Sequence, residues 1–121
     1  MSSNDTYLAV LIGGRTSARM KEWMELPEAE RNARQAKGMA AWKAWMDKHG
    51  AAVVEGGGPL GKTKRVDPQG VSDTSNAMSG FVVVRAASHE AAAKMFEGHP
   101  HFTVFPGEAI EIMPILPIPG G

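Results

Sequence analysis

The sequence contains no cysteine, which excludes a disulfide framework and any chemistry that depends on a thiolate. Its thirteen basic and thirteen acidic side chains give a formal net charge of zero, so the basic excess typical of a nucleic-acid-binding protein is missing. The apolar run at residues 7–12 is too short to cross a bilayer, and it follows Asp5 instead of a basic segment. These absences predict a cytoplasmic protein with no nucleic-acid partner, no membrane contact and no secretion signal.

A length of 121 residues fits one domain, which we expect to span residues 1–121 with its core at about 7–115. Short apolar runs predict four strands, at residues 7–12, 51–54, 81–84 and 110–113. Capping residues and apolar spacing predict two main helices, from Pro27 to about His49 and from Ser88 to Gly98.

The remaining segments have weaker patterns. Thr16 is expected to cap a short helical turn that ends at Met24, and Gly50 is expected to end the long helix in a left-handed conformation. Residues 57–79 are rich in Gly, Pro, Ser and Asp and predict a loop, with a short extended piece at 63–66 that can pair locally. Residues 114–121 predict an extended tail.

The order β-α-β-β-α-β predicts an α+β ferredoxin-like sandwich with an antiparallel sheet. The strands at 7–12 and 81–84 are apolar on both faces, whereas two helices can cover only one face of a four-stranded sheet. A second copy of the chain is the simplest cover for the other face. We therefore expect a homodimer in which two sheets pair as a dimeric α+β barrel.

Several short segments occur in a set order along the chain. They are WKAWMDKHG at 42–50, GGPL at 57–60, GFVVVRA at 80–86, SHEAA at 88–92, GHP at 98–100 and IEIMP at 110–114. In this order they resemble the YCII-related (DGPF-type) family over residues 7 to about 115. The resemblance implies the same dimeric α+β barrel.

The resemblance also bears on activity, through a pair of residues found in some members of the family. Some members of that family carry a His–Asp pair proposed as catalytic, one relative is a dehydrochlorinase that acts on a chlorinated hydroxyquinol, and members of the DGPF branch accompany sigma factors of the extracytoplasmic type. In this chain the position of the family histidine is Met39 and that of the aspartate is His99, so the pair does not carry over. Gly57 and Leu60 replace the Asp and Phe of the DGPF signature.

Residues 56–63 (GGGPLGKT) match the P-loop pattern G-x-x-x-x-G-K-[ST] and also the pattern G-x-G-x-x-G. Either phosphate site needs a helix that begins directly after the glycines, but no helical pattern follows Thr63. Pro59 also removes one N–H from the proposed cradle. We interpret the segment as a glycine-rich turn. The cations Lys62, Lys64 and Arg65 are interpreted as a solvated basic turn, with attraction of an anionic ligand as the alternative.

His99 and His101 are the strongest candidates for a functional site. Pro100 favours an extended conformation at His99, so both rings can project to one side. A metal site would need a third ligand with defined geometry. Glu97 is close in sequence but can point along the helix instead, so no metal is predicted. His49 and His89 lie at predicted helix ends, where capping or solvent exposure explains them.

Two classes of function follow from these residues. In the first, the protein binds a small polar or aromatic ligand without catalysis, in a cleft formed by Met39, Gly58, Pro59 and His101 around His99. In the second, it is an enzyme of the lyase or dehydrochlorinase type in which His99 is the general acid or base. Neither class requires a cofactor. Met39, Trp42 and Met46 form one helical stripe, which we interpret as core packing.

Overall fold

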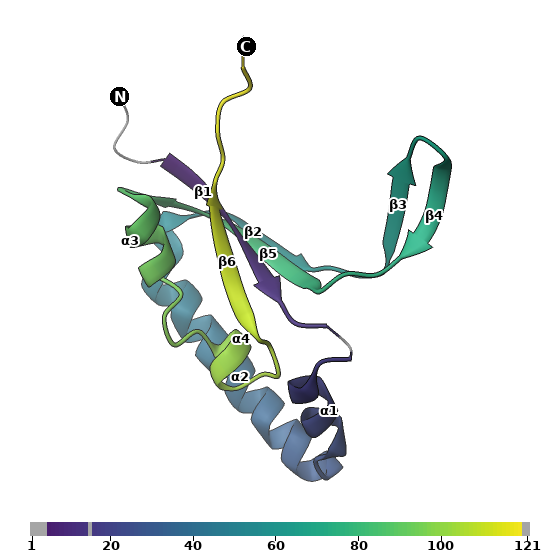
Figure 1. The fold of residues 1–121 in the computed structure, drawn as a ribbon. Coiled ribbons are helices and arrows are strands. Elements are labelled where there is room, and N and C mark those ends of the chain that lie inside the picture. Colours follow the sequence, from purple (N-terminus) through teal and green to yellow (C-terminus); the bar gives the residue numbers. More distant parts are fainter. Residues whose placement is uncertain (1–4, 15, 120–121) are drawn as a thin grey trace.

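Four antiparallel strands form the main sheet of the protein in the order β2-β5-β1-β6 (Figure 1). The computed structural model describes residues 5–14 and 16–119. The central strands are β1 (Asp5–Ile12) and β5 (Met78–Ala86), and the edges are β2 (Val53–Pro59) and β6 (Ala109–Pro114). Helices α2 (Glu28–His49) and α3 (His89–Lys94) join β1 to β2 and β5 to β6. The predicted ferredoxin-like α+β class is confirmed.

The two faces of β1 have different neighbours. Tyr7 and Ala9 are buried in one cluster with Val82 and Val84 of β5 and with Trp45 of α2, so this face packs on the helices. The alternate residues lie on the other face, because successive side chains of a strand point to opposite sides. There, Leu8 pairs with both Val83 and Met113, and Val10 pairs with Phe81.

This second, outer face carries apolar side chains in adjacent strands, as the sequence predicted. The helices all lie on the opposite side of the sheet in Figure 1. We call Leu8, Val10, Phe81, Val83 and Met113 the outer sheet face. An antiparallel sheet with one wet face normally alternates apolar and polar residues, and these strands do not.

The long helix ends at His49, as predicted, but its neighbourhood differs from the prediction in two places. Gly50 has φ −54° and ψ −37°, so it is not left-handed, and it opens a 3-10 turn at Gly50–Ala52 that replaces the start of the predicted strand. The first helix, α1 (Ala18–Glu25), is capped by Ser17, whose hydroxyl accepts from the amide of Met20. The predicted cap, Thr16, lies one residue too early for that hydrogen bond.

The loop predicted at 57–79 is wrong for most of its length. β2 continues through the glycines to Pro59, and β3 (Thr63–Asp67) and β4 (Gly70–Thr74) form a separate two-stranded hairpin before β5 begins. The predicted local pairing at 63–66 is part of this hairpin. The glycines remain in the strand because β2 carries two irregularities in its pairing with β5, which take up the extra residues.

The second crossover contains two helical pieces instead of one. Ser88 caps α3 through the amide of Ala91, as predicted. The chain then turns at Gly98, which has φ +68°, and Pro100 begins a further short helix, α4 (Pro100–Thr103), instead of ending one. Proline suits this first helical position because its missing N–H is not needed there.

Beyond β6, residues 115–118 have no regular secondary structure, and residues 120–121 of the predicted tail lie outside the described residues. In the described part of the chain, no helix is both long enough and apolar enough to span a membrane.

Candidate functional site

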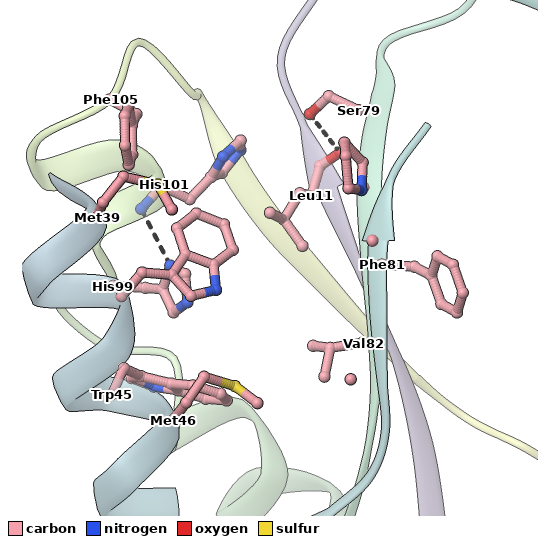
Figure 2. A pocket seen from close by; sticks show the side chains of 15 residues that line it. Leu11, Met39, Trp45, Met46, Ser79, Phe81, Val82, His99, His101 and Phe105 are labelled. Atoms are coloured by element: carbon pink, nitrogen blue, oxygen red, sulfur yellow. Dashed lines mark hydrogen bonds between the residues drawn. The ribbon is translucent and has the colours of Figure 1, made fainter. Parts of the chain in front are cut away.

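A cavity of about 530 Å³ lies between α2 and the helix-facing side of the sheet (Figure 2). Its size is within the range of small-molecule sites. Most of its lining is apolar or backbone: Leu11, Met39, Trp42, Trp45, Met46, Gly56, Gly58, Pro59, Ser79, Gly80, Phe81, Val82, His99, His101 and Phe105. No carboxylate is among these residues.

His99 reaches the cavity from the turn between α3 and α4. Gly98 in its left-handed conformation reverses the chain, and His99 then takes the extended conformation (φ −61°, ψ 141°) expected before Pro100. Its Nδ1 accepts the amide hydrogen of His101 at 3.0 Å, which caps α4. The same side chain therefore fixes a helix start and lines the cavity.

Aromatic rings surround the imidazole of His99, which is only 2% exposed. The ring of Trp42 is 4.6 Å away at an interplanar angle of 85°, and that of Trp45 is 5.1 Å away at 68°. Phe96 lies behind, at 5.8 Å. Trp45 is itself held in place, because its Nε1–H donates to the carbonyl of Met95 at 2.8 Å. The walls around His99 are thus mainly aromatic, and one of them is fixed by a hydrogen bond.

Burial among these rings, together with smaller effects of the neighbouring His101 and His49, lowers the pKa of His99 to about 4. The ring is therefore neutral at pH 7. Since Nδ1 is an acceptor, the single ring proton is on Nε2. Among the described residues, no fully buried side-chain nitrogen lacks a hydrogen-bond partner, and no protein group there bonds Nε2. We conclude that Nε2–H faces the open space of the cavity.

His101 lines the cavity too, but both its ring and its backbone hold the protein together. Its Nε2–H donates to the carbonyl of Ile12 at 2.9 Å, at the end of β1. Its own carbonyl accepts from the amide of Gly107, and a Cβ at Gly107 would collide with the imidazole. Burial lowers the pKa of His101, while the bond to Ile12 opposes that shift. This pattern is that of a structural histidine.

Phe105 closes the end of the cavity and depends on a glycine in α2. A Cβ at Gly38 would meet the ring of Phe105 at 2.5 Å, so only glycine lets the ring lie against the helix. The same ring packs against Trp42 at 6.1 Å and Trp23 at 5.9 Å. A glycine inside a helix normally weakens it, and here the gain is the close approach of an aromatic side chain.

The structure brings all five predicted site residues to this one cavity: His99, His101, Met39, Gly58 and Pro59. That a ligand occupies it stays a prediction. The interpretation of Met39, Trp42 and Met46 as core packing is wrong for Met39, which is 59% exposed, and all three line the cavity. The buried tryptophan of α2 is Trp45, three residues from Trp42.

Trp42, Trp45 and Phe105 line the cavity and were not predicted to do so from the sequence. Gly38 was the available signal, since a glycine inside a helical pattern indicates a close approach by another group. No sequence pattern indicates which group that is. Phe105 is 67 residues away along the chain (105 − 38), so only the tertiary fold brings the two together.

The glycine-rich P-loop match is followed by strand β3 and not by a helix. Gly57 has φ +64°, and a Cβ there would collide with the carbonyl oxygen of Phe81. The glycines therefore serve the irregular pairing of β2 with β5. Two of the cations after them are paired with carboxylates within the hairpin, Lys64 with Asp73 and Arg65 with Asp67.

No protein-family model matches the sequence, and no curated protein matches it either. Among solved structures, the fold is similar to that of 5-chloro-2-hydroxyhydroquinone dehydrochlorinase (TftG) from Burkholderia phenoliruptrix AC1100, solved in complex with 2,5-dihydroxybenzoquinone. The TM-score is 0.51 and the sequence identity 16%, over 89% of this chain and 90% of that chain. At this identity the likeness establishes a shared α+β fold and nothing about activity.

Proposed function

We propose that the protein binds a small aromatic molecule that carries a polar, hydrogen-bond-accepting group, in the cavity beside His99, without catalysing a reaction. The observation that carries the proposal is the neutral imidazole of His99, whose bond at Nδ1 leaves Nε2–H as a donor in a cavity walled by Trp42, Trp45 and Phe105. Apolar walls with a few well-placed polar groups are the usual composition of such a site. A ring can pack against the tryptophans while a phenol, carbonyl or carboxylate oxygen accepts from His99.

The state of His99 argues against proton transfer. A general base needs a free nitrogen lone pair, and the Nδ1 lone pair is engaged by the amide of His101. A pKa of about 4 also makes the ring a weak base. A neutral imidazole keeps its Nε2 proton and can donate a hydrogen bond without giving the proton up.

The alternative is a cofactor-independent lyase. The fold shared with a dehydrochlorinase, whose bound ligand is a hydroxylated quinone, favours this candidate. Removal of HCl from an aromatic substrate would require a proton acceptor, and His99 is the cavity group that could accept one, after breaking its bond to His101.

We also propose that the chain belongs to the YCII-related family and forms a homodimer through the outer sheet face. The ordered segments quoted above support the family, and the apolar Leu8, Val83 and Phe81 on a face without helices support the dimer. The two proposals are independent of the ligand. Leu8 and Val83 do not line the cavity, and the side chain of Phe81, which borders it, points away from it in Figure 2.

Ligand binding is tested by the thermal stability of the protein in the presence of small phenols, benzoquinones and aromatic carboxylates. The informative variant is His99→Asn, because asparagine can still cap α4 but is too short to present its amide where Nε2 lies. Loss of one hydrogen bond predicts an affinity about ten-fold weaker than that of the wild type. Lys43→Ala, on the exposed side of α2, is the matched control and should leave the affinity unchanged.

The two candidate functions give different results with 5-chloro-2-hydroxyhydroquinone. The binding proposal predicts a saturable rise in melting temperature with no release of chloride beyond that in a protein-free sample. If the wild type releases chloride and His99→Asn does not, the binding proposal is wrong and the protein is a lyase. Equal ligand responses from the wild type and His99→Asn would remove His99 from the site.

A further inference from the structure

The hairpin formed by β3 and β4 stands apart from the rest of the molecule. Within residues 5–14 and 16–119 the two strands pair only with each other, with Thr63 opposite Thr74 and Asp67 opposite Gly70. In Figure 1 the hairpin projects from the far ends of β2 and β5, on the side of the sheet that the helices do not cover. We call residues 63–74 the arm.

The arm presents an apolar surface to solvent. Val66 and Val71 lie directly opposite each other in the pairing, so their side chains share one face. They are 76% and 71% exposed. A two-stranded hairpin by itself is only marginally stable in water, and two valines that face solvent contribute little to holding it together. The arm therefore gains most from a surface that covers this valine pair.

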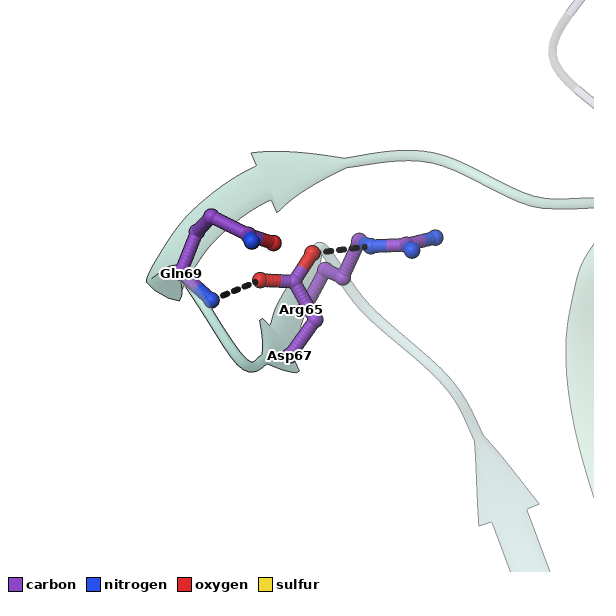
Figure 3. A network of polar contacts seen from close by, with 3 residues as sticks. All are labelled: Arg65, Asp67 and Gln69. Atoms are coloured by element: carbon purple, nitrogen blue, oxygen red, sulfur yellow. Dashed lines mark hydrogen bonds and ion pairs between the residues drawn. The ribbon is translucent and has the colours of Figure 1, made fainter.

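The charges of the arm are already paired with one another. Lys64 pairs with Asp73, next to the valines, and the Nε–H of Arg65 donates to Asp67 at 2.9 Å (Figure 3). Asp67 also accepts from the amide of Gln69, and these two bonds lower the pKa of its carboxyl group. A nucleic acid or an acidic protein would have to compete with these carboxylates for the basic side chains. The surface that fits the arm is apolar and has little net charge.

We infer that the arm is a clasp that packs its Val66–Val71 face against a second copy of this chain. The inference rests on the proposed homodimer and adds a second contact to it. The arm projects on the same side of the sheet as the outer sheet face, so a partner that covers this face would lie on the side to which the arm extends.

A second copy meets the requirements that the arm sets. The chain has a formal net charge of zero, so two copies do not repel each other. The same chain also presents the apolar outer sheet face, where Leu8 pairs with both Val83 and Met113, and the arm of the partner would pack beside the contact made by that face. In a two-fold dimer each arm would reach its partner in the same way, so that the contact is made twice.

The test compares dimer dissociation constants, measured by sedimentation equilibrium, for the wild type and two single variants of the arm. Val66→Asp places a charge on the valine face and should weaken the dimer about ten-fold or more, because a buried charge would be unpaired. Ser72→Asp is the matched control: it adds the same charge on the opposite face, across from Arg65, and should leave the dissociation constant unchanged. Circular dichroism checks that both variants are folded.

Amide hydrogen exchange of the arm is a second measurement, and it needs no substitution in the arm. The inference predicts that the amides of β3 and β4 are protected in the dimer and lose that protection at concentrations where the protein dissociates. A wild-type dissociation constant in Val66→Asp, with arm protection independent of concentration, would overturn the clasp and leave the dimer standing. A wild type that is monomeric at all concentrations would overturn both, whereas the ligand site would be untouched.

Discussion

The imidazole of His99 is enclosed by Trp42, Trp45 and Phe96, and its Nδ1 is occupied by the amide of His101. Each feature acts on a different property of the residue. Burial disfavours the charged form and sets the pKa, whereas the hydrogen bond selects the tautomer. Together they leave the ring with a neutral N–H donor at Nε2, which is the group that the proposed ligand would meet.

This environment predicts that acid destabilises the protein through His99. Its folded pKa of about 4 is lower than the ordinary 6.5, so the unfolded chain binds the proton more tightly. The contribution of His99 to the free energy of unfolding should be fully present above pH 6.5. It should be lost as the pH falls from 6.5 to 4, which lowers the free energy of unfolding by about 3 kcal/mol. Urea unfolding of the wild type and His99→Asn across this range measures the difference.

The comparison with His99→Asn isolates one histidine among several. His101 and His49, which are the titratable groups that act on His99, also have lowered pKa values and remain in both proteins. The difference between the two proteins therefore reports the titration of His99 together with its electrostatic coupling to these two histidines. Parallel stability curves for the two proteins between pH 7 and 4 would contradict the buried, neutral state of His99.

At the scale of elements, α2 forms the helical wall of the cavity, and Gly38 decides how its end is closed. In an exposed helix, Gly→Ala stabilises by about 1 kcal/mol. Here a methyl group at Gly38 would press on Phe105, so Gly38→Ala should instead lower the free energy of unfolding by about 1–2 kcal/mol. In a Phe105→Ala background the obstacle is gone, and the same change should stabilise the protein. Urea unfolding of the wild type, Gly38→Ala, Phe105→Ala and the double variant measures the effect of Gly38→Ala with and without the Phe105 ring.

The edge strand β2 contains a second glycine with a defined task. Gly57 has φ +64° and its missing Cβ leaves room for the carbonyl of Phe81, whereas a Cβ at Gly56 would meet nothing. Gly57→Ala should therefore cost about 2 kcal/mol or more of unfolding free energy, from the left-handed backbone and the close contact. Gly56→Ala, one residue away, should change it by less than about 0.5 kcal/mol. Equal effects at both sites would mean that the irregular pairing is not specific to Gly57.

At the scale of the whole molecule, two neighbouring valines of β5 allow the stability of the monomer and the formation of the dimer to be tested separately. Val82 is buried in the helix-facing core, and Val83 lies on the outer sheet face opposite Leu8. Val82→Asp should reduce the free energy of unfolding by about 3 kcal/mol or more, because a charge would enter the core. Val83→Asp should leave the monomer folded and abolish the dimer.

Sedimentation velocity at micromolar concentration, with circular dichroism on the same samples, measures both effects. A Val83→Asp protein that sediments like the wild type would place the dimer contact elsewhere on the molecule. A wild type that is already a monomer would remove the dimer from consideration.

Much of the architecture could be predicted from the sequence, since it depends on local patterns. Strand runs, the Ser88 cap and the end of the long helix at His49 are properties of neighbouring residues, and the order of elements then leaves few topologies. The sequence likewise shows directly that residues 7–12 are apolar on both faces of the strand. Errors occurred where glycine and proline have several roles, as at Gly50, Pro100 and residues 57–79.

The chemistry of the site was decided by the tertiary structure. The sequence could bring attention to His99, but its neutrality and its tautomer come from Trp42 and Trp45, more than fifty residues earlier in the chain, and from the exact turn that places the His101 amide against Nδ1. A pKa depends on desolvation and on nearby charges, which are properties of three-dimensional packing. The same residue in an open loop would titrate near 6.5, and only the fold turns it into a fixed donor.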